Sequence, residues 1–190
     1  MRPRQVTALV LAAAAGAGCG GGDSRPRDRP AIAPAVAAGE RAPTERPRAV
    51  VEDCSTRSEA DFPGAYAEPA NVVVGPVALV GAAYTPPDVV EEFGGNKFPL
   101  LVTAGHRVTL QLSRRTHRIA GLAYGPLPQG EIDLRDSHRA VTFVACAHGV
   151  TFWSGAVVVR APACVPLHIW VDDEPVPRRA TLRMGVRRCA

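Results

Sequence analysis

From residue 72 onward the chain consists of short apolar runs that are separated by glycine and proline. Most of these runs have the length of a strand and are rich in β-branched side chains, which favour strands. Apolar and polar residues alternate between 107 and 112, so this strand is expected to bury one side and to expose Arg107, Thr109 and Gln111 on the other. Strands are expected at residues 71–80, 100–103, 107–112, 119–124, 140–146, 150–160, 165–171 and 179–186.

Turn-forming residues separate these runs at regular spacing, among them Gly105, Gly125, Gly149 and the polar stretch 172–177. About eight strands with this spacing predict an all-β domain over residues 50–190. The expected architecture is an antiparallel β-sandwich of immunoglobulin-like or cupredoxin-like type. Only residues 86–93 have helical character, because proline stands in the first turn and Gly94-Gly95 follow the last.

The N-terminus has the pattern of a secretion signal. Arg2 and Arg4 precede a mostly apolar or small run, residues 5–18, that is too short to cross a bilayer as a helix. The small residues before Cys19 resemble the lipobox of bacterial lipoproteins, although Gly16 stands where that family prefers leucine. The resemblance implies that residues 1–18 are a signal peptide and that Cys19 is acylated. Ordinary secretion and an uncleaved N-terminus remain the alternatives.

Residues 19–49 are rich in proline, alanine and arginine and have almost no large apolar side chains. Such a segment buries too little surface to offset the entropy of ordering it, so a disordered, lipid-anchored linker is expected. The linker also carries part of the formal charge of +4, because residues 50–190 hold fourteen basic and fourteen acidic side chains. The arginine bias carries no functional weight, since lysine contacts phosphates equally well, and no nucleic-acid partner is expected.

The whole of residues 50–190 is similar to secreted lipoprotein-type proteins of actinobacteria. The similarity is carried by residues 122–127, 139–146, 151–155 and 159–167. It implies export and a lipid anchor, and it brings no activity with it.

If Cys19 carries lipid, four cysteines remain for two disulfides, and three pairings are possible. The expected strands 165–171 and 179–186 flank one turn, which places Cys164 and Cys189 at the same end of a hairpin. The predicted pairs are therefore Cys164–Cys189 and Cys54–Cys146.

A copper site is the alternative use of Cys146, because His148 follows it closely in a fold of possible cupredoxin type. Met184 lies 36 residues beyond His148, however, and a copper ligand at Cys146 would leave an odd thiol among the other three. A structural disulfide is favoured, and neither a metal nor another cofactor is expected.

The richest polar loop holds Glu131, Asp133, Asp136 and His138, together with Ser137. Loops on rigid sandwiches often carry function, so these residues form a candidate binding loop. Their spacing matches neither a calcium loop nor a nucleophile motif. No serine-hydrolase elbow, phosphate-binding loop or metalloprotease motif occurs elsewhere, which indicates a protein without catalytic activity.

The sequence therefore predicts a non-enzymatic binding domain on the outer face of the cell membrane, anchored in the lipid bilayer through acylated Cys19. Its expected partner is a cell-wall component or another protein. Two alternatives remain: a cupredoxin-like metal-binding protein, and a small secreted enzyme that uses loop 131–138.

Overall fold

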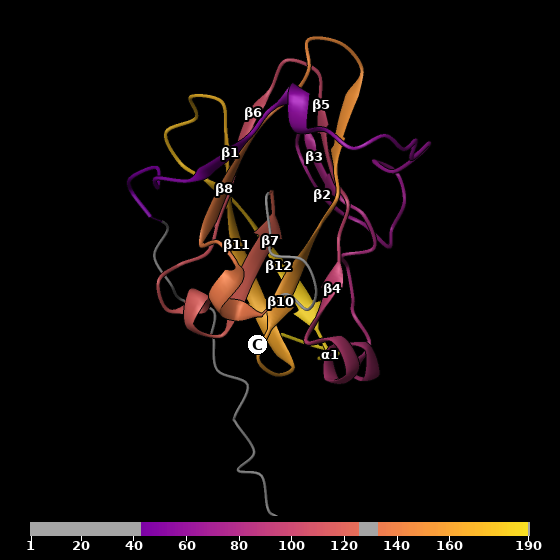
Figure 1. Ribbon diagram of the computed structural model, residues 1–190, viewed down its shortest axis with the longest axis vertical. Helices are drawn as coiled ribbons and strands as arrows, with labels where there is room; N and C mark the ends of the chain where they lie inside the picture. Colours follow the sequence, from indigo (N-terminus) through magenta and orange to yellow (C-terminus); the bar gives the residue numbers. More distant parts are fainter. Residues whose placement is uncertain (1–42, 126–132, 190) are drawn as a thin grey trace, which may run out of the picture. The chain divides into compact units, whose positions relative to one another are not determined.

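Twelve short strands form a β-sandwich in residues 43–125 and 133–189, which the computed structural model describes (Figure 1). The all-β fold expected from the sequence is confirmed. The expected signal peptide 1–18, Cys19 and most of the linker 19–49 lie outside the described residues.

One layer of the sandwich is a five-stranded sheet in the order β1-β8-β6-β11-β12. Its strands are β1 (Val50–Glu52), β8 (Ala140–Val144), β6 (Arg107–Gln111), β11 (Ala163–Val171) and β12 (Arg178–Met184). Among the described strand pairs β1 and β8 alone run parallel, so the sheet is mixed rather than purely antiparallel.

Of the residues of β6 that were expected to meet solvent, Arg107 is exposed as predicted. Thr109 and Gln111 are only 5% and 4% exposed, so the prediction is wrong at these two positions. Their polar groups are satisfied by neighbouring strands, because Thr109 bonds Thr142 at 2.7 Å and Gln111 accepts a 2.7 Å hydrogen bond from the Trp170 indole. Hydrogen bonds to buried side chains of β8 and β11 thus replace the hydrogen bonds that water would make.

The second layer consists of two sheets joined end to end. A four-stranded sheet has the order β2-β3-β5-β9, and a three-stranded sheet has the order β4-β10-β7. The strands are β2 (Val72–Val74), β3 (Val77–Leu79), β5 (Leu100–Thr103), β9 (Val150–Trp153), β4 (Gly95–Lys97), β10 (Gly155–Val159) and β7 (Ala120–Tyr124).

Two of the expected strands are in fact pairs of strands. Residues 71–80 form the hairpin β2–β3, because Gly75 turns the chain with a φ of 57°. Residues 150–160 break at Ser154 into β9 and β10. The partner strands β5 and β4 are also interrupted there, at Phe98 and Pro99, and the Phe98 N–H donates to the Gly155 carbonyl across the bend.

Three aromatic rings from the three sheets meet in the core. The Phe143 ring lies edge-on to Tyr124, with centroids 5.3 Å apart, and 5.2 Å from Trp153. The Tyr124 ring covers Gly155 so closely that a Cβ there would lie 2.0 Å from it. The Tyr124 hydroxyl donates to the Phe98 carbonyl at 2.6 Å, and complete burial raises its pKa.

The expected helix is confirmed as α1 (Pro87–Phe93), which ends at Gly94 in the left-handed conformation with a φ of 63°. Three single turns of 3-10 helix accompany it: η1 (Cys54–Thr56), η2 (Thr116–Arg118) and η3 (Leu134–Asp136). In the described part of the chain, no helix has both the length and the apolar character that a membrane span requires.

Both predicted disulfides are confirmed. Cys54–Cys146 joins η1 to the end of β8, and Cys164–Cys189 joins β11 to the chain that follows β12. Disulfides persist in oxidising compartments, so the two bridges indicate an extracytoplasmic environment.

Removing the two disulfides is expected to destabilise the domain to different extents. The bridges span 92 and 25 residues. The chain-entropy model then gives losses of about 4.5 kcal/mol for Cys54→Ser/Cys146→Ser and about 3.5 kcal/mol for Cys164→Ser/Cys189→Ser. Urea unfolding of the two double variants measures both losses. A larger loss for the 164/189 variant would contradict the order, and the unreduced wild type should yield no alkylated cysteine among these four.

Candidate functional site

The candidate binding loop forms a short helical turn with an internal ion pair. Asp133 caps η3, and its carboxylate accepts hydrogen bonds from the Arg135 guanidinium at 2.6 and 2.8 Å. Hydrogen bonds from the Arg135 side chain and backbone hold the pKa of Asp133 below its ordinary value. Glu131 lies outside the described residues.

His138 fixes this loop to the sheet through its backbone. Its N–H donates to the Leu122 carbonyl and its carbonyl accepts from the Leu122 N–H, at 2.8 and 2.9 Å. The side-chain Nε2 is buried, and within 43–125 and 133–189 it has no hydrogen-bond partner. The enzyme alternative depends on a hydrogen bond between a carboxylate and His138. No such bond occurs among the described residues of the loop.

Beside η3 lies a groove of about 950 Å³ that the sequence did not indicate. Its other walls are α1, β4 and the second half of β10. Both apolar and charged side chains line the groove, and the apolar ones are called its floor below. The apolar lining residues include Val89, Phe93, Leu134, Ala156 and Val158, and the charged ones are Glu92, Lys97, Asp133, Arg135 and Arg160.

Two glycines give this groove its shape. Gly94 ends α1 in a left-handed conformation that disfavours other residues. Gly95 lets β4 lie close to β10, because a Cβ at this position would approach the Val157 carbonyl to 2.4 Å. At the end of the helix Phe93 is 67% exposed, the highest value among the large hydrophobic side chains in the described part of the chain.

The side chains that line the groove are mostly apolar or charged. Its described lining contains no histidine, cysteine, serine, threonine or tyrosine. Of the two carboxylates, Asp133 is held by Arg135, which leaves Glu92 as the single carboxylate in the described lining without an ion pair. In the described residues no hydrogen bond joins Glu92, Lys97 and Asp133 to one another, although such a bond would mark a nucleophile and its base.

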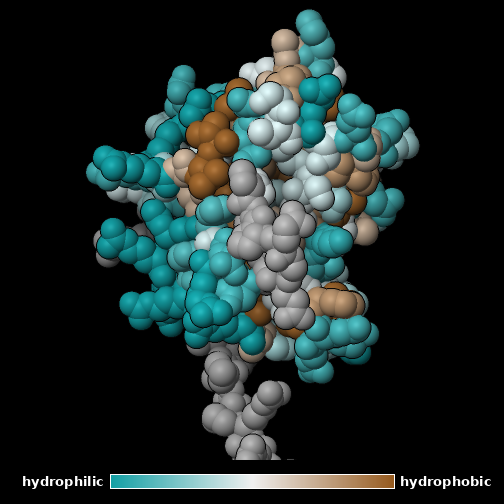
Figure 2. All heavy atoms as spheres, in the orientation of Figure 1, coloured by the Kyte–Doolittle hydropathy of each residue, from teal (hydrophilic) through white to brown (hydrophobic). Residues whose placement is uncertain are grey.

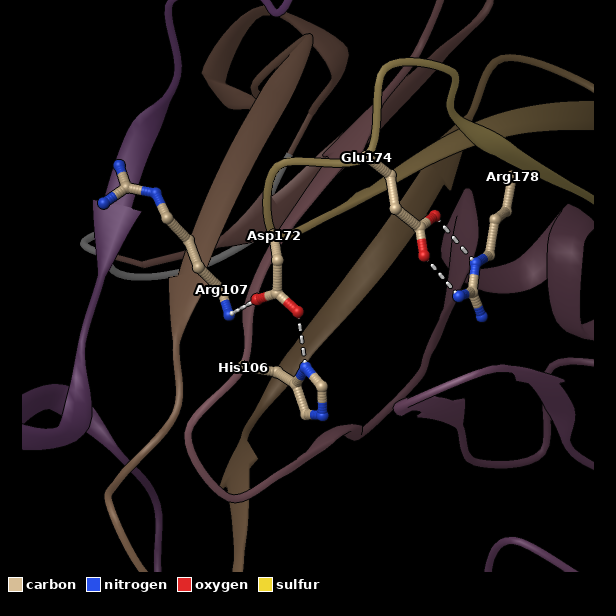
Figure 3. Close-up of polar contacts among 5 residues, drawn as sticks. All are labelled: His106, Arg107, Asp172, Glu174 and Arg178. Atoms are coloured by element: carbon tan, nitrogen blue, oxygen red, sulfur yellow. Dashed lines mark hydrogen bonds and ion pairs between the residues drawn. The ribbon is translucent and has the colours of Figure 1, made fainter.

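A second polar cluster joins two turns at the far end of β11 (Figure 3). The Asp172 carboxylate binds the His106 ring at 2.7 Å and accepts from the Arg107 backbone N–H at 2.9 Å. Nearby, the Glu174 carboxylate forms a two-bond ion pair with the Arg178 guanidinium.

Sequence analysis did not find the His106–Asp172 contact, because the two residues are 66 positions apart. The antiparallel register of β6 and β11, which pairs Val108 with Val171, is what brings their turns together. Asp172 also has a φ of 43°, which aspartate tolerates better than most residues. Both side chains are partly exposed, at 39% and 44%, and neither lines the groove.

Contacts of the folded domain begin before residue 50. The Arg46 guanidinium donates to the Glu174 carbonyl at 3.2 Å and lies 5.4 Å from the centre of the Trp170 ring. Residues 43–49 thus include a side chain that packs on the turn that carries Asp172.

Cys146 forms a disulfide with Cys54, so it cannot supply the thiolate that the copper alternative requires. Across the described residues, no three His, Cys, Asp or Glu side chains lie close enough together to hold a metal ion.

Comparison of the chain with protein-family models, with curated proteins and with solved structures found no match.

The Asp172 carboxylate is expected to give the domain part of its acid sensitivity. Partial burial opposes ionisation, but hydrogen bonds from the Arg107 N–H and His106 outweigh it and hold the pKa of Asp172 below its ordinary value. A lowered folded-state pKa stabilises the fold above about pH 4, and this contribution is lost as the pH falls through the folded pKa.

Asp172→Asn should therefore lose less thermal stability than the wild type between about pH 6 and about pH 3. Asparagine also tolerates the left-handed backbone at this position. Asp173→Asn is the matched control, because Asp173 is exposed and its side chain makes no hydrogen bond with a described residue. Thermal melts across this range measure the effect, and identical pH profiles for Asp172→Asn and the wild type would contradict it.

Proposed function

We propose that this protein is an exported lipoprotein, held on the outer face of the cell membrane by acylated Cys19. Its disulfide-bonded domain is a non-enzymatic binding module. The observation that carries the proposal is the groove beside η3, whose described lining combines apolar and charged side chains and contains no imidazole. A groove of this size falls within the range of sites that bind small molecules or single side chains.

The anchor is supported by two features of different kinds. The sequence before Cys19 resembles a lipobox, and the domain contains two disulfides of the kind found outside the cytoplasm. With proline-rich chain extending at about 3.1 Å per residue, the segment after Cys19 is long enough to hold the domain tens of ångströms from its anchor.

The walls of the groove define the partner chemically. The apolar floor suits a hydrophobic group, and the cationic Lys97 and Arg160 suit an anionic group attached to it. A cell-wall component or a protein side chain with these two features satisfies both requirements.

Phe93→Asp is expected to abolish binding in the groove while leaving the fold intact. The substitution places a carboxylate beside the apolar floor at a side chain that is already 67% exposed. Val176→Asp is the matched control, because Val176 is 62% exposed and lies outside the groove. Crosslinking in intact cells should recover the same adduct from the wild type and from Val176→Asp, and at least about tenfold less from Phe93→Asp, a loss of about 1.4 kcal/mol. Equal recovery from both variants would contradict the site.

Cys19→Ala tests the anchor separately. Without the sulfur that carries the acyl chain, the protein is expected in the culture medium, or in the cell with its signal peptide uncut. Fractionation and N-terminal sequencing distinguish these outcomes from the wild-type location. A variant that is still processed before residue 19 and still sediments with membranes would exclude the lipid anchor.

A further inference from the structure

Six exposed arginines gather at one end of the domain, where β6, β10 and β12 end and β7 and β11 begin. They come from three segments that lie far apart in the sequence. Figure 2 shows hydrophilic side chains over the part of the surface where η2 lies in Figure 1. These residues, called the arginine end below, are Arg114, Arg115, Arg118, Arg160, Arg187 and Arg188.

Specific contacts hold the three segments together. The Arg160 N–H donates to the Ile119 carbonyl at 3.0 Å, which joins the end of β10 to the turn after η2. Gly185 lies so close to Pro162 that a Cβ would approach the proline ring to 2.9 Å. The Cys164–Cys189 disulfide then fixes the chain that carries the last two arginines. The segments that carry the arginine end are therefore held together by a hydrogen bond, close packing and a disulfide.

The charges of this end are available to a partner. In the described residues the ion pairs join His106 to Asp172, Arg135 to Asp133 and Arg178 to Glu174, so none involves the arginine end. Carboxylates also lie near this end, because Glu92 of α1 and Asp133 of η3 line the groove together with Arg160. The turn at the far end of β11 carries Asp172, Asp173 and Glu174, and Arg46 and Arg178 contact this turn.

Residues 50–190 have no net side-chain charge, yet arginines that form no ion pair with a described residue are concentrated at this one end. Arginine charges within a Debye length of an anionic surface attract it, and each contributes about 1 kcal/mol, or roughly fivefold in partitioning. The exposed Phe93 lies on α1, whose C-cap Gly94 accepts a hydrogen bond from Val159, the residue before Arg160. An aromatic ring beside cationic side chains suits the interface of a bilayer.

We infer that the arginine end docks on the anionic phosphate headgroups of the bilayer that carries the lipid anchor. The inference rests on the proposed function for its location, since acylated Cys19 would keep the domain near that surface. Docking would point the β11–β12 turn, which carries Asp172 and Asp173, away from the membrane. The groove, which shares Arg160 with the arginine end, would then open close to the headgroups.

Vesicle sedimentation tests the docking without the lipid anchor. The chain from Gly20 to Ala190 keeps every described residue and lacks Cys19. It should bind phosphatidylcholine vesicles that contain phosphatidylglycerol, in a salt-dependent manner, and should not bind vesicles of phosphatidylcholine alone. Arg114→Glu/Arg115→Glu/Arg118→Glu should lower the partition coefficient by at least about a hundredfold.

The matched control is Arg57→Glu/Arg107→Glu/Arg179→Glu, which removes the same charge from exposed sites outside the arginine end. It should bind within a few-fold of the unsubstituted chain. Equal loss in both variants would overturn the inference, because total charge alone would then explain binding. Binding to soluble polyphosphate but not to vesicles would overturn it as well. Because the tested chain has no acyl group, docking and anchoring can each fail independently of the other.

Discussion

The contact of three aromatic rings in the core is the constraint on which the sandwich depends. Tyr124, Phe143 and Trp153 belong to three different sheets, and each ring packs on the next at 5.2–5.3 Å between centroids. Such pairs contribute beyond the apolar area that they bury. The Trp153 indole also donates to the Asp53 carbonyl next to Cys54, which ties the cluster to one of the disulfides. Short strands that would be marginal as separate sheets are thereby held in one core.

This aromatic cluster also determines where the groove forms. The Tyr124 hydroxyl bonds the Phe98 carbonyl at the bend between β4 and β5, and its ring occupies the space above Gly155 at the matching bend between β9 and β10. The bend divides the second layer, so the three-stranded sheet extends beyond the four-stranded one. The strand β4 and helix α1 lie along its edge, and η3 faces them across the groove. The position of the groove on the outside is thus connected with the packing on the inside.

Local features were readable from the sequence, and features that depend on strand register were not. The helix ended by Gly94 and most strand positions follow from nearby residues, and the hairpin flanked by Cys164 and Cys189 followed from one turn. The break at Ser154 was missed because it reflects a bend shared with a distant strand pair. The contact between His106 and Asp172, and the burial of Gln111 under Trp170, were missed for the same reason: each needs the pairing of β6 with β11. In the candidate loop the residue types were polar as expected, but Asp133 is satisfied within its own turn.

The distribution of charge over the surface could not be predicted from the composition of the domain. Fourteen basic and fourteen acidic side chains cancel in residues 50–190, and a count along the chain therefore assigns the basic character to the N-terminal segment. The fold concentrates part of the basic charge, because three segments that are distant in the sequence bring six exposed arginines to one end of the domain. Such a concentration of charge acts on orientation, since it draws one end of a molecule toward an anionic surface. This property depends on which strand ends lie side by side, and a count of charges along the chain does not contain it.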